Sequence, residues 1–454
     1  MTSMFEISRS TPTPNPSSQG RGEIIVLRRG ACPGLSAPMQ TGDGLLVRML
    51  PLGTMSLEAF AGLCAAARQH GNGVVEITAR GSIQVRGLSQ ASAPRFSAAI
   101  AALRIVAADG IAVRVGPLAG LDPNEILDTE KLAADVRVAL VEHGLDIQLA
   151  PKISVVIDGG TALGLDGLSA DVRLHAELQN ERVVFAVSVG GDQHIGFVAP
   201  EDVAKVVLSL LEVIAKHRRD VRARDIINNE GVEQFGLAVR DLLLVSARPR
   251  ESGDPEPDSR LRGNERKSVI GAHPLQGGAL ACGVGLAFGH ADAIGLQSLV
   301  EAAAARGATG LRAAPGRALI FVDFSPEALG VFTADAEQLG FVVRADDPRR
   351  FVAACAGAPA CASAHIGARA LAPRIAAQCA DSLGDWFTIH VSGCAKGCAL
   401  FAPAALTVVG TAAGCALVAD GTARDAPFAI VATEEMPVAV ARYVRALNDG
   451  AYHV

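Results

Sequence analysis

Two pairs of cysteines are the residues of this sequence whose types and spacing most directly indicate chemistry. Cys355 and Cys361 form a C-x5-C pair, and Cys394 and Cys398 form a C-x3-C pair further along the chain. Four thiolates that converge on one point are soft ligands, which suit zinc or an iron–sulfur cluster. Four buried core thiols are the structural alternative, because free cysteine is among the most buried residue types.

The spacing of these four residues, called the candidate cluster cysteines below, favours a 4Fe-4S cluster. Structural zinc usually pairs cysteines two to four residues apart, so the gap between Cys355 and Cys361 is wide for zinc. The glycine and alanine neighbours of both pairs would let backbone amides approach cluster sulfides, where hydrogen bonds tune the reduction potential. We therefore expect all four cysteines to bind one 4Fe-4S cluster.

Length, composition and charge limit what else the protein can be. The chain has 454 residues, enough for two to four domains, and half of them are apolar. A net charge of −6 argues against a nucleic-acid partner, so an anionic ligand would need a local basic cluster. Nine cysteines without a disulfide pattern indicate a reducing, cytoplasmic setting.

No segment of the sequence predicts a membrane partner. The N-terminus lacks the basic-then-apolar pattern of a signal peptide. The uncharged stretch Gly397–Ala419 is long enough to cross a bilayer, but proline and glycine residues interrupt it. We interpret it instead as a hairpin, with strands over Ala405–Val409 and Cys415–Val418, and we expect a soluble protein.

The elements that must position these residues follow a repeated plan. The first half predicts a strand over Gly44–Gly53, a helix over Leu57–His70, a strand–turn–strand over Val74–Arg86 and a helix over about Ser92–Arg104. Near residue 280 the same order recurs, and the turn that carries Arg80 aligns with the turn that carries Arg317. We interpret this as an internal duplication of a half of about 230 residues.

A larger segment follows each repeated unit. The first contains strand candidates Ile153–Ile157, Val172–Ala176 and Val183–Val189 and a helix over Ala199–Lys216. The expected domains are a disordered tail (1–22), a first half (23–112), a first larger domain (113–245), a flexible linker (246–272), a second half (273–347) and a second larger domain with the candidate cluster cysteines (348–454). Tail and linker are rich in proline and polar residues and lack an apolar period.

The glycine-rich stretch Gly283–Gly289 does not predict a dinucleotide site. Its spacing is G-x-G-x-x-x-G, and it coincides with a strand of the repeated unit. We interpret it as a closely packed strand. Because no nicotinamide or flavin site is apparent, we expect electrons to arrive from an external donor protein.

The cysteine signature, C-x5-C followed by G-C-x-x-G-C, resembles that of the nitrite/sulfite reductase superfamily. The resemblance covers nearly everything except the tail and the linker. It implies an α+β fold of duplicated ferredoxin-like halves plus two larger repeat domains around a pseudo-twofold axis. It also implies that the second repeat domain holds the cluster, and that an acidic tetrapyrrole binds in a basic crevice between the halves.

Within the superfamily, the chain is similar to the precorrin-3B synthase branch. Arg28–Arg48, Pro117–Pro123 and Ser392–Cys398 carry this similarity. Members of the branch hydroxylate precorrin-3A at C20 with dioxygen and form a ring lactone in cobalamin synthesis. The resemblance therefore implies precorrin-3A, dioxygen and an electron donor as partners. A separate mononuclear non-haem iron would also be consistent, but the sequence does not assign its ligands.

Arg48, Arg80 and Lys152 lie where local motifs match the tetrapyrrole-binding positions of the superfamily. Arginine suits a substrate with many carboxylates, because its planar guanidinium binds carboxylate in a bidentate way. For each of the three, an exposed surface charge is the alternative. Arg86 and Arg317 are lesser candidates for the same role.

Other interpretations remain open. Reductases of the superfamily carry a second lysine two residues after the position of Lys152, where this chain has Ser154, so a sirohaem-dependent sulfite or nitrite reductase is the weaker hypothesis. A non-catalytic electron-transfer protein is a third. His365 and His390 flank the cysteine motifs, and we expect both to be satisfied core residues rather than ligands.

Overall fold

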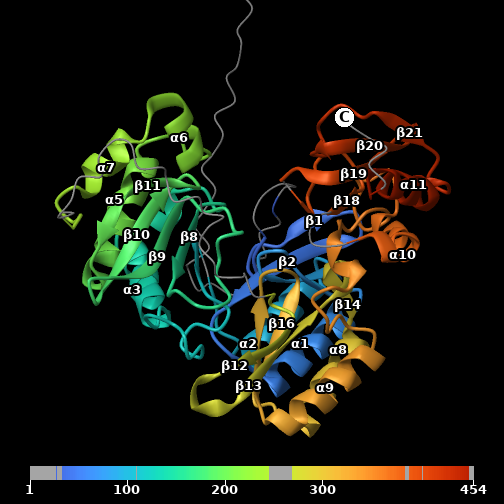
Figure 1. Ribbon diagram of the computed structural model, residues 1–454, viewed down its shortest axis with the longest axis horizontal. Coiled ribbons are helices and arrows are strands. Elements are labelled where there is room, and N and C mark those ends of the chain that lie inside the picture. Colours follow the sequence, from blue (N-terminus) through green and yellow to red (C-terminus); the bar gives the residue numbers. More distant parts are fainter. Residues whose placement is uncertain are drawn as a thin grey trace, which may run out of the picture.

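The computed structural model describes residues 27, 33–108, 110–244, 268–383, 388–400 and 402–448. The predicted tail and most of the predicted linker lie outside these residues. In the described part, no helix is both long and apolar enough to cross a membrane. The described residues form four β-sheets, two in a central body and one in each of two flanking units (Figure 1).

The first half forms a sheet with the strand order β1-β2-β5-β4-β14, and a short strand β6 pairs with the end of β2. Helix α1 begins after Ser56, whose side chain accepts a hydrogen bond from the amide of Ala59 at 3.1 Å, a capping contact typical of serine. The elements are β1 (Met39–Thr41), β2 (Gly44–Pro51), α1 (Leu57–His70), β4 (Val74–Ile77), β5 (Ile83–Leu88), α2 (Ser92–Ala102), β6 (Ala107–Ala108) and β14 (His290–Asp292).

The second half repeats this plan with the strand order β12-β13-β16-β15-β3. Asp292 and Ser325 cap its two helices through their side chains. The elements are β3 (Met55–Ser56), β12 (Gly271–Pro274), β13 (Leu280–Gly285), α8 (Ala293–Ala305), β15 (Gly310–Ala314), β16 (Ala318–Phe324) and α9 (Pro326–Gln338).

The two halves exchange one edge strand each, which relates them by a pseudo-twofold axis. Strand β3 precedes α1 in the chain but pairs with β15, and β14 precedes α8 but pairs with β4. The two turns that follow β4 and β15 meet, because the amide of Gly316 donates to the carbonyl of Ala79 at 3.0 Å. A single apolar core joins both halves, and its largest buried side chains are Phe60, Phe96, Phe321, Phe324 and Phe332.

The two flanking units share a second topology and lie on opposite sides of the central body (Figure 1). In each, three parallel strands are followed by two antiparallel ones. The first repeat domain contains β7 (Ala112–Val115), α3 (Glu130–Glu142), α4 (Leu145–Gln148), β8 (Ser154–Asp158), β9 (Val172–Gln179), β10 (Arg182–Val189), β11 (Gln193–Val198), α5 (Val203–Ala215), α6 (Ala223–Glu230) and α7 (Glu233–Val239). The second contains β17 (Val352–Ala354), α10 (Ala368–Gln378), β18 (Ile389–Ser392), β19 (Ala404–Thr411), β20 (Gly414–Gly421), β21 (Ala429–Val431) and α11 (Met436–Asn448).

The predicted fold class is confirmed, and the differences are local. The expected helix over Ala199–Lys216 begins instead as a 3-10 turn, Pro200–Asp202, before α5. Gly283 lies in β13 as expected, and a Cβ there would lie 1.6 Å from the carbonyl oxygen of Val269. The remaining 3-10 turns are Gln276–Gly278, Ala287–Gly289, Pro348–Phe351 and Ala380–Ser382.

Candidate functional site

The candidate cluster cysteines lie at one edge of the sheet of the second repeat domain. Cys355 follows β17 and Cys394 follows β18, and these two strands are parallel neighbours, so their carboxyl ends meet. Cys361 and Cys398 lie in the loops that continue from those ends. Burial raises the pKa of the Cys398 thiol, and the other three cysteines raise that pKa further, so all four lie within electrostatic range of one another.

The surroundings of these sulfurs are compatible with an iron–sulfur cluster. The amide of Gly393 donates to the Sγ atom of Cys355 at 3.1 Å, and a Cβ at Gly393 would lie 3.4 Å from that sulfur. No three of the four described sulfurs lie within 4.8 Å of one another. One tetrahedral zinc would draw them to about 3.8 Å, since each Zn–S bond is about 2.3 Å. The wider spacing leaves room for a multi-iron centre.

A buried histidine beside the cysteines has ring nitrogens without partners. His390 in β18 is fully buried, and neither ring nitrogen has a hydrogen-bond partner among the described residues. Burial lowers the pKa of His390 to about 4, helped by the nearby positive charge of Arg317, so the ring is neutral. The expectation of satisfied core histidines is therefore wrong: His390 is buried but unsatisfied, and His365 is exposed. An unpaired ring N–H next to a cluster could donate to a sulfide.

The first-half sheet presents a polar face opposite its apolar core. Register places Arg48 of β2, Gln84 of β5, Glu76 of β4 and His290 of β14 in one row. With its amide oxygen turned toward Arg48, Gln84 accepts from that guanidinium and donates to Glu76 at 2.8 Å. The neighbouring row of valines packs into the core, as the two-residue period of a strand requires.

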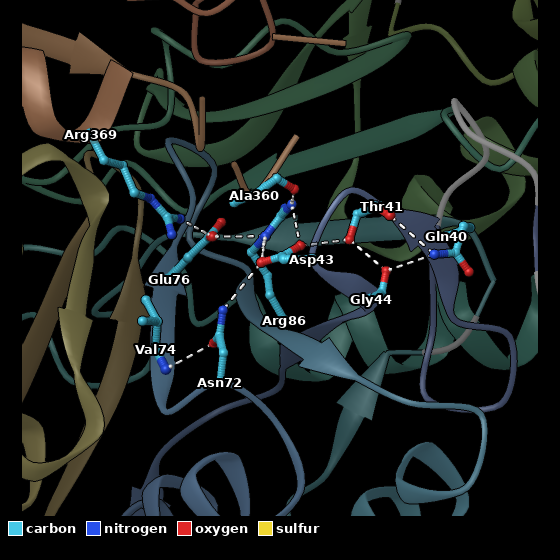
Figure 2. A network of polar contacts seen from close by, with 10 residues as sticks. All are labelled: Gln40, Thr41, Asp43, Gly44, Asn72, Val74, Glu76, Arg86, Ala360 and Arg369. Carbon is cyan, nitrogen blue, oxygen red and sulfur yellow. Dashed lines mark hydrogen bonds and ion pairs between the residues drawn. The ribbon is translucent and has the colours of Figure 1, made fainter. Parts of the chain in front are cut away.

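This polar face contacts the loop that carries the first cysteine pair (Figure 2). The guanidinium of Arg86 donates to the carbonyl of Ala360 at 2.6 Å, directly before the second candidate cysteine. Asp43 pairs with Arg86 at 3.1 Å, and Glu76 lies 3.7 Å from it. Arg369 of α10 also pairs with Glu76. Arg86 thus connects the first half to the loop of the first cysteine pair through buried contacts. It does not line the hollow described next.

Four arginines line an open hollow where the two halves meet the first repeat domain. Arg80 follows β4, Arg114 lies on β7, Arg137 on α3 and Arg312 on β15; Glu130 is the one acidic residue among the lining side chains. We call this cavity the arginine hollow. Its other lining residues are Leu50, Pro51, Leu52, Gly53, Gly81, Val113, Val115, Gly116, Pro117, Leu165, Leu168, Ala313 and Pro315.

Arg114 is a strongly perturbed cation of the hollow. Burial, together with the positive charges of Arg80 and Arg48, lowers the pKa of Arg114 to about 10. Its Nη1 atom donates to the carbonyl of Arg80 at 2.6 Å and its Nη2 atom to the hydroxyl of Ser82 at 3.1 Å. Its buried Nε atom has no partner among the described residues. Like charges that crowd together while a donor stays unpaired are expected where an anion binds.

Hydrogen bonds from two arginines of the hollow hold two loops of the first repeat domain in place. The guanidinium of Arg312 donates to the carbonyl of Ala119 at 2.8 Å and to the hydroxyl of Thr54 at 2.7 Å, and Arg80 donates to the hydroxyl of Ser169 at 2.6 Å. In the first of these loops, burial raises the pKa of Glu125 to about 7.

A second group of potential metal ligands lies on and beside the sheet that carries Arg114. Ligand atoms of Asp158, Asp166 and His175 all lie within 4.8 Å of one another. Asp158, the last residue of β8, pairs in register with His175 in the middle of β9, two residues beyond the row that contains Arg114, and Asp166 lies in the loop between these strands. Nδ1 of His175 lies 3.8 Å from Oδ2 of Asp158, so an ion pair alone would also account for this contact.

The structure brings two of the three predicted tetrapyrrole-binding residues together. Arg48 and Arg80 both lie close enough to Arg114 to lower its pKa. Lys152 is exposed in the turn before β8 and is not among the residues that line the hollow. Ser154 is 2 % exposed, and its hydroxyl has no described partner. Sequence reasoning missed both Arg114 and the strand that carries it, β7, although a cation between two valines is a signal that could have found it.

Comparison with known proteins assigns the chain to a family. It is 38% identical over 439 residues to a protein named Precorrin-3B synthase from Sinorhizobium sp, an alignment that covers 96% of this chain and 92% of the relative. The chain belongs to the precorrin-3B synthase family. Like that relative it is an enzyme, and the family falls within the nitrite/sulfite reductase superfamily.

Other similarities connect this precorrin-3B synthase family member to the wider superfamily. Residues 37–103, from β1 to α2, match the family described as Nitrite/Sulfite reductase ferredoxin-like half domain. The chain is 24% identical to the chloroplastic ferredoxin–nitrite reductase of Zea mays, over 79% of this chain and 68% of that one. The structure of the Mycobacterium tuberculosis NirA protein superposes with a TM-score of 0.70 at 18% identity, covering 88% of this chain and 80% of NirA, which shows a shared fold.

Proposed function

We propose that the enzyme hydroxylates precorrin-3A at C20 with dioxygen and forms the ring lactone of precorrin-3B in cobalamin biosynthesis. Similarity to the Sinorhizobium precorrin-3B synthase over nearly the whole chain supports this reaction. One oxygen atom enters the C20 hydroxyl and the other leaves as water, which requires two electrons and two protons. The electrons come from an external donor protein.

The observation that carries the proposal is the arginine hollow. Precorrin-3A bears acetate and propionate arms, and carboxylates pair favourably with guanidinium groups. We propose that Arg48, Arg80 and Arg114 bind these arms on one edge of the macrocycle, while Lys152 reaches an arm from outside the hollow. The excess of positive charge lies where two halves and a repeat domain meet, and clefts of this kind concentrate anionic ligands.

We further propose that the four candidate cluster cysteines hold a 4Fe-4S cluster. Their convergence at one sheet edge, the amide donated to Cys355 and the unpaired ring of His390 support this assignment. Such a cluster, when bound, transfers single electrons. The chain's contribution is to hold the thiolates at that edge and to fix the loop of Cys355 and Cys361 against the central body through Arg86.

A separate mononuclear non-haem iron would supply the centre that activates dioxygen. We propose Asp158, Asp166 and His175 as its ligands, because iron accepts imidazole and carboxylate ligands and because Asp158 and His175 lie on the sheet that carries Arg114. Iron analysis with electron paramagnetic resonance tests this assignment. We expect about five irons per chain in the native protein and about four in His175→Ala, with the cluster signal unchanged; equal iron contents would leave the trio as an ion pair.

Turnover with and without oxygen tests the proposed reaction. The reconstituted protein, supplied with precorrin-3A and reductant, should form product in air and none under anaerobic conditions. The similarity to plant nitrite reductase makes a sirohaem-dependent reductase the second candidate. Sirohaem would give intense visible bands, whereas a cluster alone gives a broad brown shoulder. Sulfite or nitrite reduction with a viologen donor, accompanied by those bands, would replace our proposal with the reductase.

A further inference from the structure

Arg317 lies beside the candidate cluster because the two halves have diverged at equivalent turns. It aligns with Arg80 in the duplicated plan, and the turns that carry the two residues meet at the pseudo-twofold axis. Arg80 lines the arginine hollow. Arg317 instead donates from Nη2 to the carbonyl oxygen of Ala399 at 3.1 Å, directly after Cys398. One copy of the turn serves the hollow, and the other contacts a cysteine loop.

A glycine in the neighbouring backbone leaves space for the side chain of Arg317. Gly289 has φ +84°, and a Cβ at that position would lie 2.8 Å from Cδ of Arg317. Any larger residue would therefore be strained and would displace the guanidinium. The side chain of Arg317 is partly buried and lines a second, smaller hollow, together with Arg349 and Arg350.

Arg317 has no compensating carboxylate. No acidic side chain forms an ion pair with it in the part of the chain that the structure describes, and burial lowers its pKa without any acidic neighbour to raise it. Arg86, in contrast, contacts Asp43 at 3.1 Å and Glu76 at 3.7 Å. Partial removal of a guanidinium from water costs free energy unless an anion lies nearby. A negative charge close to Arg317 would therefore offset a cost that no described carboxylate offsets.

We propose that Arg317 is the counter-ion of the iron–sulfur cluster, a positioning residue that fixes the Cys398 loop and raises the reduction potential of the cluster. This inference rests on the proposed 4Fe-4S cluster. With four thiolate ligands such a cluster is an anion, and it gains a further negative charge on reduction. A cation held at short range stabilises the reduced state more than the oxidised state.

A redox titration of the holoprotein, followed by electron paramagnetic resonance, tests the proposal. In Arg317→Met the ratio of reduced to oxidised cluster at a fixed potential should fall at least about tenfold, or about 59 mV for one electron. The matched control is Arg182→Met, which removes an exposed arginine at the start of β10 in the first repeat domain. Because that charge is exposed and belongs to the other repeat domain, water and salt screen it from the cluster, and its ratio should change less than about threefold.

Iron content and substrate affinity, measured for every variant, distinguish the counter-ion role from a loss of the cluster or of substrate binding. Arg317→Lys keeps the charge and should retain a potential near that of the native protein. If Arg317→Met loses the cluster while Arg317→Lys retains it at the native potential, the counter-ion role is supported. A potential in Arg317→Met that matches Arg182→Met overturns it, as does weaker precorrin binding with an unchanged potential. If the native protein itself binds no iron, the proposed cluster fails and not this inference alone.

Discussion

Replacing Arg114 by methionine should separate ligand binding from stability. Arg114 lines the hollow together with Arg80, so its guanidinium can pair with a carboxylate arm of the substrate. A hydrogen bond to a charged group is worth about 1.5–3 kcal/mol. Since 1.4 kcal/mol corresponds to about tenfold, Arg114→Met should weaken precorrin-3A binding by about ten- to a hundredfold.

Stability should respond differently to the same change. Methionine loses the hydrogen bonds from Arg114 to the carbonyl of Arg80 and the hydroxyl of Ser82, each worth about 0.5–1.5 kcal/mol. It also removes a buried cation whose pKa is lowered to about 10 by burial and by Arg80 and Arg48. These effects oppose each other, so the melting temperature of the ligand-free protein should change little.

Difference spectra or fluorescence quenching measure the affinity, and iron content confirms an intact cluster. Arg182→Met provides the control, because Arg182 is an exposed arginine at the start of β10 and outside the hollow. An affinity of Arg114→Met within about threefold of the control would refute the role of the hollow. A large loss of stability that parallels the loss of binding would show instead that Arg114 is structural.

Three further predictions follow from the cysteines, the first-repeat loop and the regions outside the described residues. Serine at Cys361 should abolish most iron binding and the brown colour, whereas Cys379→Ser should not. The folded-state pKa of Glu125 is raised, so stability should fall as pH rises from about 4.5 to about 7; Glu125→Gln should remove this loss, giving a higher melting temperature than the native protein at pH 8 and an equal one at pH 4. Limited proteolysis should cut 1–22 and 248–267 first without loss of activity, and protection of 248–267 would contradict this.

The fold was predictable because its signals are local. The capped helix after Ser56, the strand–turn–strand around Arg80 and its repeat around Arg317 each follow from apolar period and turn residues. The exchanged strands β3 and β14 are only two and three residues long, too short for any periodic pattern. Their pairing depends on contacts between halves that lie far apart in sequence.

The candidate site was only partly predictable, for reasons of register and packing. The candidate cluster cysteines could be proposed from the sequence alone, because the spacing of the two pairs is visible there. Asp158 and His175 meet only because β8 and β9 are parallel neighbours in a particular register. The different roles of Arg86 and Arg114 depend on which face of a strand each occupies and on what covers that face, which a single sequence does not state.

Incorporation of labelled oxygen tests the central claim most directly. The protein, with its iron content verified, would convert precorrin-3A under ¹⁸O₂ in unlabelled water, and mass spectrometry would measure the product. The proposed reaction predicts one labelled oxygen atom per product molecule, located in the hydroxyl at C20. An unlabelled hydroxylated product would show that the oxygen comes from water, and the absence of product together with sulfite or nitrite reduction would establish the reductase instead.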